Sequence, residues 1–279
     1  MKNVTATIII CFLAISLLYC SQGEQKVTLR FKYEPGLNLK YEQLTKRNTK
    51  VFENGEMTES YSRNYDMTVK QSVVGIAADG TAEIVEEDSW VYIKPNEKDS
   101  TIIDTVMHSR ELTMNVAANG KVVKVGFADD TDAATISYLR NYFEQAWPVF
   151  PDGELPVDYS WTQTATVVMT DETLEASTTY SIKSLVREAG YDCAVVDYSG
   201  NMLIPLMPSA KKPEFIGGID RIKTSGVIYF AYKEGVVVLQ REQWTIHGER
   251  QKRSDKGVVD ITVEVELDSD YTLVHREKI

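Results

Sequence analysis

Apolar and polar residues alternate with a period of two along most of this chain. Residues 27–33 show the pattern clearly, with an apolar side chain at every second position. Such alternation is typical of a strand with one buried face. Turn-forming pairs that end in glycine recur between these stretches, at 54–55, 79–80, 119–120, 234–235 and 256–257. Because Asn-Gly and Asp-Gly accept the positive φ angles of tight hairpin turns, the pattern predicts a mainly β protein built of antiparallel hairpins.

One segment in the middle of the chain departs from this alternation. Between residues 131 and 147 the apolar residues recur at steps of three and four, which predicts an amphipathic helix. Aspartates within 129–132 precede the segment as capping and first-turn carboxylates, and Pro148 ends it. So short a helix needs buried contacts to be stable. We therefore expect an apolar stripe to pack on the concave face of the sheet, formed by Ile136, Leu139, Tyr142, Phe143 and Trp147.

The stretches before and after the helix resemble each other. In each, strands lead to a glycine, Gly75 or Gly190, and then to a long hairpin around 119–120 or 234–235. The repetition predicts an internal duplication with Gly75 and Gly190 at equivalent turns, although ordinary hairpin rhythm would give a similar pattern. The predicted domains are an export signal at 1–23, a first β repeat at 24–128, a helix and linker at 129–149, and a second β repeat with appended C-terminal strands at 150–279.

Neither repeat would cover the edges of its own sheet. Exposed strand edges recruit other strands, so proteins tend to pair or cover them. We therefore expect one long, twisted antiparallel sheet, half-barrel-like in shape, that curves around the helix.

The amino terminus has the pattern of a bacterial export signal. Lys2 precedes an apolar run at 4–18, and small residues follow within 21–23. The run is shorter than the roughly 20 residues that span a bilayer, which disfavours a retained anchor. The pattern predicts an extracytoplasmic protein, located in the periplasm, at the outer membrane or on the cell surface.

Two ways of processing this signal remain open. Cleavage before Glu24 would release a soluble protein. Alternatively, residues 17–20 resemble a lipobox, in which Cys20 would be acylated and would tether the protein to a membrane. Tyr19 departs from the small residue that a lipobox has before its cysteine. Any membrane association is expected through this lipid anchor.

Composition narrows the classes of partner. A hydrophobic content of 43% supports a folded core, and a net charge of −11 opposes binding to nucleic acid. Cys193 is the single cysteine beyond the signal region, so we expect a buried thiol and no internal disulfide.

Several of these features together resemble a known group of proteins. The export signal, the strand-rich body and the stretches at 150–161 and 190–194 resemble uncharacterised secreted proteins and lipoproteins of Bacteroidetes-type bacteria. That group is classed as domains of unknown function, so the resemblance implies export and no particular activity. The expected curved sheet is also similar in architecture to the half-barrels of LolA-type lipoprotein carriers, a likeness that transfers no residue.

The chain offers little catalytic chemistry. Its three histidines lack metal-site spacing, and we find no nucleophile elbow, phosphate loop or dinucleotide fingerprint. The acidic stretches at 129–132 and 268–270 lack the spacing of a calcium loop, and 86–88 is interpreted as a solvated acidic run. We therefore predict a protein that is not an enzyme and that has no catalytic residue, metal or cofactor.

An apolar stretch at 202–208, bounded by prolines, is interpreted as a loop that covers the helix or lines a pocket. The predicted ligand is apolar, such as a lipid, and the predicted pocket lies beside the helix. The alternatives are an envelope protein partner, a structural or assembly role in an outer-membrane complex, and glycan binding. The candidate pocket residues are Leu139, Tyr142, Phe143, Trp147, Met202, Leu203, Ile204, Leu206 and Met207.

Overall fold

The computed structural model describes residues 25–95, 103–127, 131–168, 173–208, 214–255 and 257–279, so the export signal and Cys20 lie outside the described residues. No helix within these ranges is long and apolar enough to cross a membrane. The elements are β1 (Lys26–Val27), β2 (Leu37–Glu53), β3 (Glu56–Ile76), β4 (Ala82–Pro95), β5 (Ile103–Val116), β6 (Val122–Phe127), α2 (Ala133–Ala146), β7 (Leu155–Pro156), β8 (Ser160–Val168), β9 (Thr173–Glu188), β10 (Tyr191–Leu206), β11 (Phe215–Ala231), β12 (Val236–Ser254) and β13 (Gly257–Lys278).

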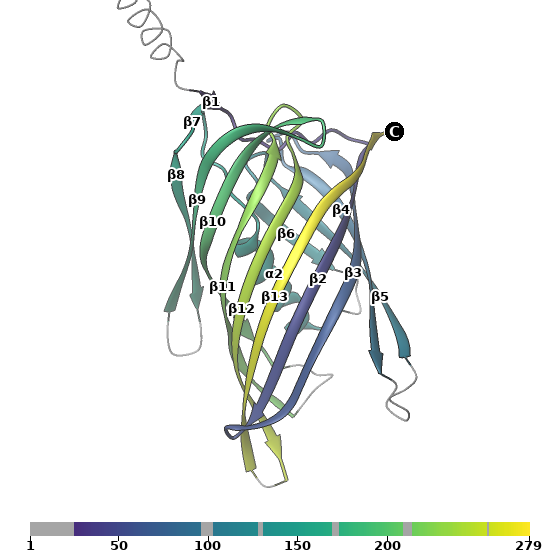
Figure 1. Cartoon of the computed structure of the whole chain (residues 1–279), viewed down its shortest axis with the longest axis vertical. Coiled ribbons are helices and arrows are strands. Elements are labelled where there is room, and N and C mark those ends of the chain that lie inside the picture. The colour runs from purple at the N-terminus through teal and green to yellow at the C-terminus, as the bar shows by residue number, and fades with distance from the viewer. Residues whose placement is uncertain (1–24, 96–102, 128–130, 169–172, 209–213, 256) are drawn as a thin grey trace, which may run out of the picture.

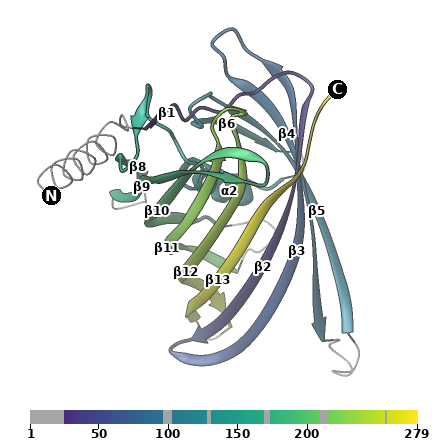
Figure 2. The same ribbon diagram turned by 45° about the horizontal axis from the view of Figure 1, so that its top comes forward.

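Eleven strands form one antiparallel sheet, in the order β6-β5-β4-β3-β2-β13-β12-β11-β10-β9-β8. The short strands β1 and β7 pair separately. The sheet is strongly twisted and curved, and α2 lies on its concave side (Figures 1 and 2). The edge strands β6 and β8 do not pair with each other. The predicted fold, mainly β with a long antiparallel sheet around a mid-chain helix, is confirmed.

Two meanders of five strands, β2–β6 and β8–β12, make up the sheet, and β13 pairs with one strand of each. The hairpins at 119–120 and 234–235 join the fourth and fifth strands of their meanders. Gly75, however, lies inside β3 at a register shift against β4, whereas Gly190 has a φ of +88° in the turn before β10. The expectation that these two glycines occupy equivalent turns is wrong. Common descent of the two meanders stays a prediction.

Local signals at both ends set the bounds of α2. Asp132 is the N-cap, and its Oδ1 accepts hydrogen bonds from the backbone N–H groups of Ala134 and Thr135 at 3.1 and 3.2 Å. Such a cap satisfies amides that have no partner inside the helix. Pro148 follows the C-cap and prevents the helix from continuing. The helix packs against β10 and also reaches both edge strands, β6 and β8, so it lies between the two unpaired edges.

Gln145 binds α2 to the backbone of β10. Its Oε1 accepts a hydrogen bond from Leu203 N at 2.9 Å, and its Nε2 donates to Leu203 O at 2.8 Å. The pairing of β10 with β9 ends at Asn201, so these backbone groups have no strand partner on that side. The buried amide therefore takes the place of a strand partner where β9 separates from β10.

The turn after α2 is held by both meanders. Phe150 N donates to Asn119 O at 2.8 Å, which ties this turn to the hairpin between β5 and β6. Val149 O accepts from the indole of Trp161 at 3.0 Å, and Val149 N donates to Gln163 Oε1 at 3.0 Å. These bonds fix the exit of the helix against β8.

Leu139→Ala is expected to lower the free energy of unfolding by about 2 to 5 kcal/mol, as truncations in well-packed cores do. Leu139 is only 8% exposed and belongs to the main core cluster. The measurement is chemical denaturation, with Arg140→Ala as the control because Arg140 is exposed on the same helix. Equal, near-zero losses for both variants would mean that α2 is peripheral.

Candidate functional site

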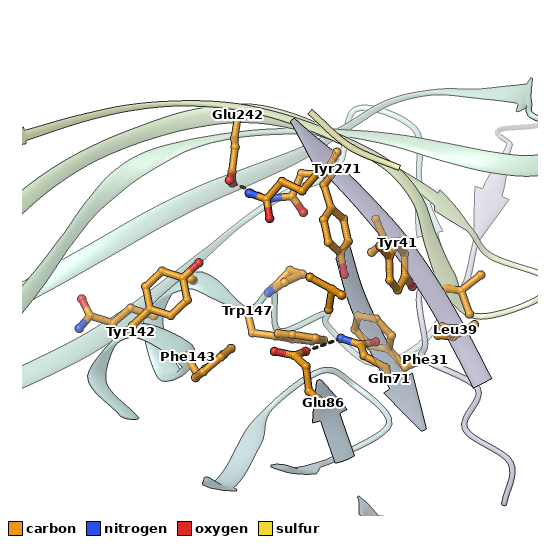
Figure 3. Close-up of a pocket in the computed structure, with 18 of the residues that line it drawn as sticks. Phe31, Leu39, Tyr41, Gln71, Glu86, Tyr142, Phe143, Trp147, Glu242 and Tyr271 are labelled. Carbon is orange, nitrogen blue, oxygen red and sulfur yellow. Dashed lines mark hydrogen bonds between the residues drawn. The ribbon is translucent and has the colours of Figure 1, made fainter. Parts of the chain in front are cut away.

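A cavity of about 180 Å³ lies between the concave face of the sheet and α2. Strands of both meanders form its walls, from β2 to β5 on one side and from β9 to β12 on the other. Tyr271 of β13 lies between these two sets, and Tyr142 and Trp147 contribute from the helix and its C-cap (Figure 3). The site therefore depends on the complete sheet rather than on either meander.

Aromatic rings form much of the cavity surface. Tyr41 and Tyr271 stack across β2 and β13 with ring centroids 4.4 Å apart. Tyr142 contacts Trp244 of β12 at 5.8 Å and Phe143 at 5.2 Å. Aromatic pairs at these distances are favourable, so the rings form a stable wall.

Buried polar side chains line the β4 and β5 side. Glu86 is 5% exposed and accepts a hydrogen bond from Gln71 Nε2 at 2.7 Å. Asp88 is 3% exposed, and its Oδ2 accepts from Arg110 Nε at 3.0 Å and also from Arg110 Nη2. Buried carboxylates are costly unless they are paired or protonated, so their presence in this core is not explained by packing alone.

The pKa values of these carboxyls reflect their burial. Removal from water raises the pKa of Glu86 to about 7, and the nearby charge of Asp88 adds to the rise, while Gln71 and Arg110 oppose it. Burial also raises the pKa of Asp88, and Arg110 opposes that shift. Glu86 therefore keeps its proton to a higher pH than an exposed glutamate does.

A third carboxyl, Glu242 of β12, faces the cavity from the opposite wall (Figure 3). Its Oε2 accepts hydrogen bonds from Gln240 Nε2 at 2.9 Å and from the hydroxyl of Tyr198 at 3.2 Å. Burial raises the pKa of Glu242, and these hydrogen bonds oppose the rise. Both of its partners are neutral, so the carboxylate form is hydrogen-bonded without a compensating charge.

Four buried polar atoms of cavity residues have no hydrogen-bond partner among the residues that the structure describes. They are the hydroxyl of Tyr33, Oδ1 of Asp88 and the indole Nε1 atoms of Trp147 and Trp244. More than nine in ten buried polar groups in proteins do have a partner. Unpaired donors and acceptors around one cavity are typical of a site that a polar ligand group or bound water completes.

The structure separates the candidate pocket residues into three groups. Tyr142, Phe143, Trp147 and Met202 line the cavity. Leu139 and Ile204 are buried in the core around α2 without lining it. The others lie elsewhere: Leu203 in a separate apolar cluster, Leu206 partly buried, and Met207 54% exposed.

The predicted apolar loop at 202–208 is wrong for residues 202–206, which form the end of β10. Met202 and Ile204 pack under the helix, while Leu203 packs with Val167 and Ile219. Both faces of the strand are therefore covered here. A strand buried on both faces has a continuous apolar run without alternation, and such a run is easily mistaken for an apolar loop.

The prediction of a solvated acidic run at 86–88 is wrong for two of its three residues. Only the side chain of Glu87 is exposed, at 57%. Glu86 and Asp88 are in phase with the buried residues Ala82 and Ile84, so the alternation places them on the concave face. The alternation in β4 was therefore the signal in the sequence that Glu86 and Asp88 face the cavity.

Comparisons with known proteins do not identify a family. No family model matches this chain, and no curated protein matches it. Among solved structures, the chain is similar to a "putative exported protein with YmcC-like fold" from Bacteroides fragilis. The identity is 13%, the match covers 90% of this chain and 100% of that one, and the TM-score is 0.30. A likeness at this level carries no argument about function.

Proposed function

We propose that this protein is an exported, non-enzymatic binding protein that holds an amphipathic small molecule in the cavity between its sheet and α2. The observation that carries the proposal is the set of unpaired polar atoms, on Tyr33, Asp88, Trp147 and Trp244, in a cavity otherwise rich in aromatic rings. A purely apolar ligand would leave these atoms unpaired, whereas an amphipathic one would satisfy them. Export is inferred from the amino-terminal sequence pattern.

The cavity walls also support binding over a structural role alone. Tyr33, Tyr142, Trp147 and Tyr271 are partly exposed although the rings pack against the core, so the cavity surface is not fully closed by protein. Ligand sites in proteins combine an apolar lining with a few convergent polar groups, and this cavity has both.

The test is saturable binding of the neutral apolar fluorophore N-phenylnaphthylamine to the full chain. Val69 lines the cavity and is 4% exposed, so Val69→Phe fills part of the space. We expect this variant to lower the affinity by at least about tenfold, which corresponds to about 1.4 kcal/mol. Val74→Phe is the matched control on the same strand, because Val74 is 54% exposed.

A second measurement covers the case in which Val69→Phe does not fold, as circular dichroism would reveal. Protein purified from its native envelope is extracted with organic solvent, and the extract is examined by mass spectrometry. A molecule recovered at near-stoichiometric amount supports the proposal. The proposal fails if the fluorophore shows no saturable binding and the extract contains no bound molecule.

A further inference from the structure

We infer that the cavity selects an organic cation, an apolar molecule with a protonated amine, whose ammonium group lies between Glu86 and Glu242. The inference rests on the proposed function, because it names the chemical class of the ligand for the same cavity. It also differs from the sequence-based expectation of a purely apolar ligand, since the polar half of the site was not part of that expectation.

The first argument is the charge of the lining. Three carboxyls, Glu86, Asp88 and Glu242, line the cavity, and Arg110 is the one cationic side chain among the described lining residues. Arg110 binds Asp88 through two of its nitrogens. The balance of fixed charge in the ionised cavity is therefore negative, which favours a positively charged ligand group.

The second argument is the kind of partner that the remaining carboxyls have. Glu86 is hydrogen-bonded to the amide of Gln71, and Glu242 to the amide of Gln240 and the hydroxyl of Tyr198. Within the described parts of the chain, no ion pair involves either glutamate. A neutral donor orients a carboxylate without neutralising it, so a ligand ammonium would supply the missing charge.

The third argument is an unused acceptor next to Glu86. Asp88 is 3% exposed, and while its Oδ2 binds Arg110, its Oδ1 has no partner among the described residues. This atom is an acceptor only, and an ammonium group is a donor only. Oδ1 of Asp88 therefore matches an ammonium group better than a fatty acid carboxylate, while the indole N–H donors of Trp147 and Trp244 would need an acceptor elsewhere on the ligand.

The aromatic wall agrees with this choice. Figure 3 shows Glu86 and Glu242 on opposite sides of the cavity, with Tyr142, Trp147 and Tyr271 in the region between them. The faces of tyrosine and tryptophan rings attract cations. An alkyl or aryl body can contact the same rings while the amine meets the carboxylates.

The experiment compares three ligands of equal chain length, namely octylamine, octanol and octanoate, as competitors of N-phenylnaphthylamine on the full chain at neutral pH. We expect octylamine to displace the fluorophore at a concentration at least about tenfold lower than octanol, and octanoate to be the weakest. Equal competition by octylamine and octanol, or stronger competition by octanoate, would overturn the inference while leaving the proposed function intact. Failure of the fluorophore itself to bind would instead count against the proposed function.

The variants Glu86→Gln and Glu242→Gln separate charge from shape, since glutamine is nearly isosteric with glutamate. Each is expected to lower the preference for octylamine over octanol by about tenfold. Glu87→Gln is the matched control, because Glu87 neighbours Glu86 on β4 but is exposed. Retention of the full octylamine preference in the double variant Glu86→Gln/Glu242→Gln would show that these carboxyls do not hold the amine.

Discussion

Gly120→Ala is expected to destabilise the protein by about 3 to 5 kcal/mol. Gly120 has a φ of +95° in the turn between β5 and β6, where an L side chain is strained. A Cβ at this position would overlap the carbonyl oxygen of Pro148 and would lie 2.8 Å from Phe31 Cε2. Neither neighbour can move freely, because Phe31 stacks on Phe150 with centroids 5.4 Å apart and the turn at Pro148 is held on both sides.

Gly80→Ala is a closely matched control. Gly80 has a φ of +83° in the turn between β3 and β4, and nothing lies within 4 Å of its added Cβ. Both glycines donate to an alanine carbonyl three residues earlier, at 2.9 Å for Gly80 and 2.8 Å for Gly120. In Gly80→Ala the expected loss of stability therefore comes from backbone strain alone and is about 1 to 2 kcal/mol. Equal losses in chemical denaturation would show that the hairpin does not need close contact with the helix exit.

Glu86→Gln is expected to change how stability depends on pH. The pKa of Glu86 rises on folding from 4.5 to about 7, so the folded state holds a proton that the unfolded state has already released between these values. Stability should therefore fall as pH rises through this window, by about 3 kcal/mol in total. Glu86→Gln should remove the part of this fall that Glu86 causes and be the more stable protein at about pH 8, while the raised pKa values of Asp88 and Glu242 leave a smaller fall.

The measurement is denaturant unfolding of the ligand-free protein across this pH range. The titratable groups that face Glu86 are Asp88 on β4, Arg110 on β5, Tyr41 on β2, Tyr271 on β13 and Tyr142 on α2. Glu87→Gln should keep the wild-type slope, since Glu87 is exposed. A wild-type profile that is flat from about pH 5 to pH 8 would contradict the raised pKa.

Local signals in the sequence predicted the elements well. The aspartate cap and Pro148 bound the helix at 133–146, inside the predicted 131–147, because capping acts over a few residues. The alternation also predicted most of the strands, but it was wrong at residues 27–33. There every second side chain is buried or half-buried, yet only Lys26–Val27 forms a strand, the two-residue β1. The order of the strands could not be predicted from local signals, because the pairing of β13 with β2 joins residues more than 200 positions apart. No local pattern indicates that partner.

The candidate site was predicted only on its apolar side. Tyr142, Phe143 and Trp147 were placed beside a pocket because a short helix must bury its apolar stripe. The carboxyls were missed because charged residues almost never lie in a core, so a run of three acidic residues is normally solvated. Glu242 is in phase with Trp244 and Ile246 of β12, so the alternation was again the available signal that its side chain faces inward.

The position of β13 has a consequence for how the protein is made. It lies between β2 and β12 and pairs with both along most of its length (Figure 1, yellow beside purple). It is also the last of the described strands to leave the ribosome or an export channel. Until it arrives, β2 and β12 present two long unpaired edges, which are prone to aggregation. Long-range pairing of this kind slows folding, so we expect cavity assembly to be a late step that requires a chaperone or rapid translocation.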